Sequence, residues 1–266
     1  MYQNQSSPMR FAFPLGILVA VIGVGSLWIS GQIFGPPSTT AAKTLLYYVI
    51  PLVTAVVMLV LLGQKKAFDH FGSKLPAVVT LGWYLIVAAL TLAGLFYVSI
   101  PKDQVVTPAL GTIGIYLAVT CTTALFEEIL CRGTIQNLLV DRYGTSPAGV
   151  WKAIVLSSGI FALIHFANLI DKPYFVLGTL TQVVYTFCLA TLIGVIYYLT
   201  KDLLVAIVLH AIFNFFGGIT DVFIAPTTSA ATPADIPLNG MIIQIAIMLP
   251  ATLLAYRLYR KRLAAA

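Results

Sequence analysis

Charged side chains are scarce in this sequence. Lys, Arg, Asp and Glu together make up 9% of its 266 residues, whereas 59% are hydrophobic. Soluble domains carry about 25% charged residues. The mean hydropathy is correspondingly high, at +0.96. This shortage of charge excludes a soluble globular protein and predicts an integral membrane protein, for which the lipid bilayer is the main solvent.

Cysteine is also rare. The three cysteines, Cys121, Cys131 and Cys188, all lie in apolar runs. An odd number with none in a loop excludes a disulfide framework, and we expect all three to be small buried hydrophobic residues.

Acidic residues are fewer than basic ones, 9 against 15, which gives a net charge of +6. Because Lys and Arg are scattered between apolar runs, they indicate membrane topology and not nucleic-acid binding.

Long apolar runs dominate what remains. A membrane-spanning helix needs about 20 mostly apolar residues. The first run is longer than the core of a signal peptide, which is about 7–15 residues, so we interpret it as a retained helix. The predicted fold is all-α, a polytopic bundle of about eight transmembrane helices. The eight runs are 11–34, 45–63, 76–100, 109–140, 150–170, 174–199, 203–220 and 239–257.

The loops between these runs carry an unequal share of Lys and Arg. In bacterial and other membranes, cytoplasmic loops are enriched in these residues. The bias predicts that both termini are cytoplasmic and that the protein lies in the plasma membrane of a prokaryote. One side collects Lys43, Lys102 and Lys172, and the other collects Arg10, Lys65, Lys66, Lys74, Arg142, Lys152, Lys201, Arg257, Arg260, Lys261 and Arg262.

The stretch ALFEEILCRG places three charges, Glu127, Glu128 and Arg132, in the middle of the fourth run. Each such residue costs about 2.5–3.5 kcal/mol at mid-membrane on insertion scales. Residues four apart share a helix face, so Glu128 can pair with Arg132. Glu127 points about 100° away and has no local partner. One interpretation is an interhelical ion network that only holds the bundle together.

Two later runs each carry a histidine. Phe161 and His165 share a face of the fifth run, and His210 and Asn214 share a face of the seventh. Each alone is typical of interhelical hydrogen bonding. Counted from the helix ends, we expect these groups and Glu127 to meet in the cytoplasmic half of the membrane. They would line one cavity there that opens to the cytoplasm, as an active site does.

In order, the motifs are Glu-Glu-x-x-x-Arg at 127–132, Phe-x-x-x-His at 161–165 and His-x-x-x-Asn at 210–214. This ordered set resembles the CPBP family, also called the Abi or CAAX-protease-like family. That family includes the Ras-converting CAAX endopeptidase of eukaryotes and bacterial proteins linked to peptide processing and bacteriocin self-immunity. The resemblance covers roughly residues 105–220, between N-terminal helices in 1–104 and a segment 221–266 with an extracytoplasmic loop, the last helix and a basic cytoplasmic tail.

The resemblance implies an eight-helix membrane fold that hydrolyses peptide bonds inside the membrane. Glu127, helped by His165, would activate the attacking water, and His210 with Asn214 would stabilise the oxyanion. Glu128, Arg132 and Phe161 would be supporting groups. The implied partner is a peptide or protein substrate reached from the membrane or the cytoplasm.

Elementary chemistry is consistent with these roles. A carboxylate can serve as a general base, and an imidazole and an amide can donate hydrogen bonds to an oxyanion. Cys131 is a poorer nucleophile, because apolar burial disfavours the thiolate. We expect no cofactor and no metal: there is no His-Glu-x-x-His helix, and Asn214 is a weak zinc ligand. By number alone, however, Glu127, His165 and His210 could form a zinc site.

Three other functions remain open at this stage. The chain could be a non-catalytic immunity or partner-binding protein on the same scaffold, since fold does not determine function. It could be a metal-dependent hydrolase. It could also be a transporter that uses the paired charges as a proton relay.

Overall fold

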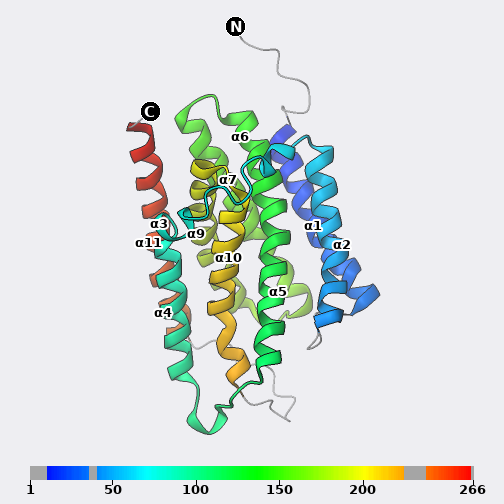
Figure 1. Cartoon of the computed structure of the whole chain (residues 1–266), viewed down its shortest axis with the longest axis vertical. Helices are drawn as coiled ribbons and strands as arrows, with labels where there is room; N and C mark the ends of the chain where they lie inside the picture. The colour runs from blue at the N-terminus through cyan, green and yellow to red at the C-terminus, as the bar shows by residue number, and fades with distance from the viewer. Residues whose placement is uncertain (1–10, 36–40, 225–237, 265–266) are drawn as a thin grey trace.

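The computed structural model describes residues 11–35, 41–224 and 238–264, and these residues form a helical bundle (Figure 1). Within the described chain the only strand-like contact is an antiparallel bridge between Val105 and Ile224. The elements are α1 (Ala12–Phe34), α2 (Ala41–Leu61), η2 (Lys65–Phe68), α3 (Ala77–Thr80), α4 (Trp83–Ser99), η3 (Lys102–Gln104), α5 (Leu110–Glu128), η4 (Ile129–Gln136), α6 (Asn137–Tyr143), α7 (Pro147–Leu163), η5 (Ile164–Ala167), α8 (Asn168–Asp171), α9 (Val176–Thr200), α10 (Leu203–Gly218), η6 (Ile219–Phe223) and α11 (Leu238–Ala264).

The predicted all-α membrane architecture is confirmed. Six helical segments in the described chain are long and apolar enough to cross a membrane, and two shorter apolar helices cover Leu45–Leu61 and Trp83–Ser99. All eight fall within or close to the predicted runs. Most of the predicted loop that follows the seventh run lies outside the described residues. The six long segments are Ala12–Phe34, Leu110–Tyr143, Pro147–Asp171, Val176–Thr200, Leu203–Phe223 and Leu238–Arg262.

The predicted run 76–100 is divided in the structure, because α3 ends before Gly82 and α4 begins after it. Gly82 lies against α10. A Cβ atom at this position would be 2.2 Å from Cδ2 of Leu209 and 2.5 Å from the carbonyl oxygen of Val78. Only glycine therefore permits this approach of α4 to α10, directly beside His210.

The fourth predicted run forms one continuous helical segment of 34 residues, Leu110–Tyr143. Its centre, η4, is a π-helix of eight residues, all of them buried. The π-helix begins immediately after Glu128. Wider turns of this kind occur mostly in short pieces, often at functional sites. The sequence did not predict this change of helix type.

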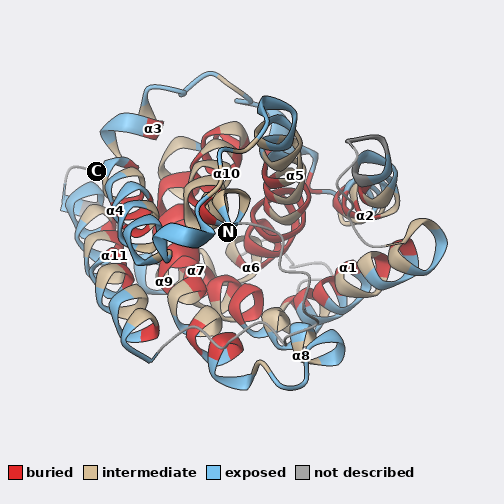
Figure 2. Ribbon diagram, turned by 90° about the horizontal axis from the view of Figure 1, so that it is seen from below, coloured by how far each residue is buried: buried red, intermediate tan, exposed pale blue. Residues whose placement is uncertain are grey.

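The central helices carry most of the buried residues (Figure 2). α10 packs against α4, α5 and α9, while α11 covers α9. α2 packs beside α5 and η4, and α1 packs beside α2 and η4. Cys131 and Cys188 are buried, as predicted, but Cys121 is exposed on the outer side of α5. The prediction was wrong for Cys121 because a helix in the bundle turns part of its apolar surface outward, toward where lipid would lie.

Candidate active site

Glu128 and Arg132 form an ion pair at the start of the π-helix. Arg132 Nε lies 3.3 Å from Glu128 Oε2, and neither side chain has any exposed surface. The predicted pairing is therefore confirmed. The guanidinium group also donates to the carbonyl oxygen of Ala190 at 3.3 Å and lies over the ring of Phe161 at 5.2 Å. These contacts fix the orientation of Glu128.

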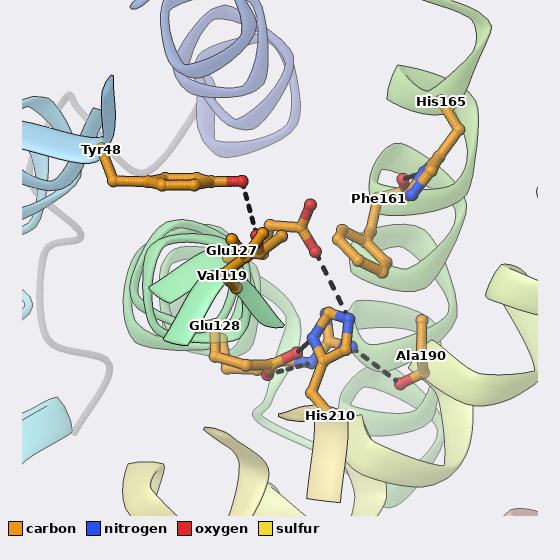
Figure 3. A network of polar contacts seen from close by, with 10 residues as sticks. Tyr48, Val119, Glu127, Glu128, Phe161, His165, Ala190 and His210 are labelled. Carbon is orange, nitrogen blue, oxygen red and sulfur yellow. Dashed lines mark hydrogen bonds and ion pairs between the residues drawn. The ribbon is translucent and has the colours of Figure 1, made fainter. Parts of the chain in front are cut away.

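His210 lies between the two glutamates (Figure 3). Its Nδ1 is 2.8 Å from Glu128 Oε1, and its Nε2 is 3.4 Å from Glu127 Oε2. Glu127 thus has no partner on its own helix, as expected, but has one on α10. The two glutamates point in different directions from α5, and one imidazole reaches both because its two nitrogens lie on opposite sides of the ring.

This arrangement constrains where protons can lie. A neutral imidazole has one N–H group, and ionised carboxylates only accept hydrogen bonds. If Nδ1 donates to Glu128, then Nε2 and Glu127 attract each other only when one of them carries a proton. Glu127 is the more accessible of the two carboxylates, with 17% of its side chain exposed against 0% for Glu128.

Phe161 separates the two histidines and contacts both. Its ring meets His165 edge-on at 5.1 Å and His210 at 5.7 Å. His165 Nδ1 is 2.9 Å from the carbonyl oxygen of Phe161. Because a carbonyl only accepts, Nδ1 carries the hydrogen, and the Nε2 of neutral His165 is then an acceptor. This Nε2 atom can therefore accept a hydrogen bond from a water molecule in the cavity.

All four residues expected to act in catalysis line one cavity of about 390 Å³, together with Phe161. The expectation that Glu127, His165, His210 and Asn214 share a single cavity is met. The lining residues lie in the half of the bundle away from the ends rich in Lys and Arg, and which of the two halves is cytoplasmic stays a prediction. His165 lies in η5, beyond the end of α7, so this helix has nearly crossed the bundle before the chain reaches His165.

The contribution of α9 to the cavity was not predicted from the sequence. Gln182, Tyr185 and Thr186 line the cavity from this helix. Their spacing of three and four residues puts them on one face, a signal that was present in an otherwise apolar run. Asn168, one turn beyond His165 and the first residue of α8, donates from Nδ2 to Gln182 Oε1 at 2.9 Å, which ties α8 to the cavity wall.

Two alternative chemistries find little support in the side chains present. Cys131 is buried within η4 and is not among the residues that line the cavity. Among the described residues, no three His, Cys, Asp or Glu side chains are grouped in a way that could hold a metal ion. Independence from metal stays a prediction, with a test given below.

The helical bundle and its buried carboxylate–histidine cavity define a polytopic membrane protein with a candidate hydrolytic site. Residues 109–216 match the family model described as type II CAAX prenyl endopeptidase Rce1-like. The matched segment contains all seven motif residues, so the predicted resemblance to the CAAX protease family is confirmed for this part of the chain. This match supports an intramembrane protease of the CAAX type. A comparison with curated proteins gives no match.

Proposed function

We propose that the chain is a glutamate-type intramembrane endopeptidase that cleaves a peptide bond of a membrane-associated protein or peptide. The observation that carries this proposal is the single cavity shared by Glu127, His165, His210 and Asn214. The family match supports the same class of reaction. Peptide hydrolysis needs a base for water and donors for the oxyanion, and this set of side chains can supply both.

In the proposed mechanism, a water molecule bound by His165 and Glu127 attacks the carbonyl carbon while Glu127 takes a proton from the water. The carbonyl oxygen becomes an oxyanion that accepts hydrogen bonds from the Asn214 amide and from Nε2 of protonated His210. Collapse of this intermediate breaks the C–N bond. The proton held by Glu127 passes to the leaving nitrogen, so that the products are a free carboxyl group and a free amine.

Glu128 and Arg132 act in this mechanism by positioning His210. Glu128 holds Nδ1, which directs Nε2 toward Glu127 and the cavity. Arg132 neutralises Glu128 and keeps its carboxylate in place. A third group that orients a catalytic histidine is a general feature of such sites.

The proposal also concerns membrane topology. α2 has 21 residues and therefore spans about 31 Å, enough for one crossing. With α4 crossing as well, the chain passes the membrane eight times and both termini lie on the same side. The excess of Lys and Arg in the described loops near that side favours the cytoplasm, and we assign the protein to a prokaryotic plasma membrane.

Replacement of Asn214 tests the oxyanion site. Asn214→Ala is expected to lower kcat about 10²–10³-fold on a cleavable membrane peptide, with little change in KM, because only the transition state loses a donor. The matched control is Asn239→Ala at the exposed start of α11, which makes the same chemical change away from the cavity. Equal activity of the two variants would contradict the assignment of Asn214.

Chelation tests the metal question. The purified protein is expected to keep full activity after exhaustive treatment with a chelator, with no stoichiometric metal in elemental analysis of the same sample. The reason is that, in the part of the chain that the structure describes, no three His, Cys, Asp or Glu side chains are grouped so that they could hold a metal ion. Activity that disappears with the metal and returns on addition of one equivalent of zinc would establish the metal-dependent alternative instead.

A further inference from the structure

The cavity lies toward one end of the bundle. Most of its lining residues come from the second halves of α4 and α10, from the first half of α9, from the start of α11 and from α5 no further along than Glu127, while Leu189 and His210 lie near the middle of α9 and α10. All these portions point to the end where α4 finishes and α5 begins, the lower end in Figure 1. Tyr116, Gly217 and Gly218 are the lining residues nearest that end on α5 and α10.

Toward the other end, the bundle is closed by packed side chains. Glu128 and Arg132 have no exposed surface, and every residue of η4 is buried. The second half of α9 is also buried from Cys188 to Tyr197. Leu203, Val205 and Ala206 of α10 are also packed at this end, and each is 0% exposed. These packed side chains therefore block the access of a substrate to the cavity from this end.

The closed end is the one rich in Lys and Arg. The described loops and helix ends near it contain Lys65, Lys66, Lys74, Arg142, Lys152, Lys201, Arg257, Arg260, Lys261 and Arg262. The open end carries Lys43, Lys102 and Lys172, close to Asp103, Asp171 and Asp221. An excess of ten to three in these residues marks the closed end as cytoplasmic.

We infer that the cavity is reached from the extracytoplasmic side and that its substrate is a polypeptide segment without acidic side chains, presented at the outer face of the membrane. That the occupant of the cavity is a substrate rests on the proposed function. The side from which the cavity is reached does not depend on catalysis. It differs from the starting expectation of a cytoplasmic opening. It follows from two independent observations, the position of the cavity and the distribution of charge.

The cavity wall defines the substrate chemistry. Its ionisable side chains are Glu127, the two histidines and the phenols Tyr116 and Tyr185, and the remainder are apolar or neutral polar groups such as Gln182. The wall contains no Lys or Arg to pair with an acidic substrate residue. Glutamine, threonine and asparagine side chains can instead hydrogen-bond to a peptide backbone.

The inference also excludes one substrate class. Prenyl groups are attached to cysteines at the C-terminal ends of proteins, in anchors that hold proteins to a membrane surface. Such a tail at the cytoplasmic face would meet the closed end of the bundle. The substrates expected here are extracytoplasmic loops, tails or released peptides that reach the membrane from outside.

Side-specific labelling of single cysteines tests this inference without any need for turnover. In a Cys121→Ser background, Gln182→Cys places a thiol on the cavity wall, and Lys152→Cys places one at the exposed start of α7, at the opposite end. A membrane-impermeant maleimide is expected to label the Gln182 variant in intact spheroplasts and the Lys152 variant only after permeabilisation. Gln244→Cys, on α11, provides a second cavity probe if the Gln182 variant does not fold.

The reverse pattern, with Lys152→Cys labelled in intact spheroplasts and the cavity thiols only after permeabilisation, would overturn the inference. Cavity thiols that stay unlabelled in both preparations, in protein that retains its thermal transition, would overturn it as well. Adding Glu127→Gln is expected to leave the labelling pattern unchanged. Failure of the proposed function would thus appear as absent cleavage with correct labelling, distinct from failure of the inference.

Discussion

Glu127→Gln is expected to lower kcat by about 10²–10⁴-fold while leaving expression and the thermal transition almost unchanged. Glutamine has nearly the same shape as glutamate and can still hydrogen-bond to Nε2 of His210, which lies 3.4 Å from Glu127. It cannot take a proton from water. The measurement is steady-state cleavage of a membrane peptide, together with thermal unfolding of the same preparations in detergent.

Asp103→Asn is the matched control, because it makes the same acid-to-amide change on the exposed η3 segment. Its activity and stability are expected to equal those of the parent. The outcome that contradicts the assignment is a Glu127→Gln variant that unfolds, combined with a Glu128→Gln variant that folds but has no activity. In that case the roles of the two glutamates would be exchanged.

Glu128→Ala is expected to destabilise the folded protein by about 3–5 kcal/mol and to abolish activity as a consequence. The substitution leaves Arg132 as a charge with no exposed surface and removes its partner. Breaking a buried ion pair by removing one member costs about this much, because the remaining charge stays buried without compensation. Denaturant unfolding of the purified protein in detergent measures the effect.

The chain provides its own control for this prediction. Lys66 and Asp141 form an ion pair at the bundle end with 48% and 33% of their side chains exposed. Lys66→Ala is expected to change stability by about 1 kcal/mol or less, since water screens exposed pairs. The double variant Glu128→Gln with Arg132→Met is expected to recover part of the loss from Glu128→Ala. If Glu128→Ala lowered the free energy of unfolding no more than Lys66→Ala does, this result would contradict the account.

Much of the architecture could be predicted because the bilayer imposes strong rules. Long apolar runs must form helices, so the all-α fold and the positions of the runs followed from composition and length. The ion pair of Glu128 and Arg132 followed from a spacing of four residues on one helix. These features depend on local sequence, and the structure confirms them.

The remaining features depend on how helices pack, which spacing within one helix does not reveal. Nothing in the residues of η4 distinguishes a π-helix from an α-helix. The contact of His210 with both glutamates joins α5 and α10, two helices 82 residues apart in the chain at this point. The position of His165 in η5, beyond the end of α7, could not be predicted from the sequence, because small errors in helix ends add up over a full crossing.

The central claim is tested most directly by incubating the purified protein with membrane peptides in water enriched in ¹⁸O and analysing the products by mass spectrometry. The account predicts cleavage at an internal peptide bond, with one ¹⁸O atom in each newly formed carboxyl terminus and no such product from the Glu127→Gln variant. Cleavage of equal extent by parent and variant would contradict it. So would a pure, folded parent protein that cleaves no peptide, which is the behaviour of a non-catalytic binding protein built on the same scaffold.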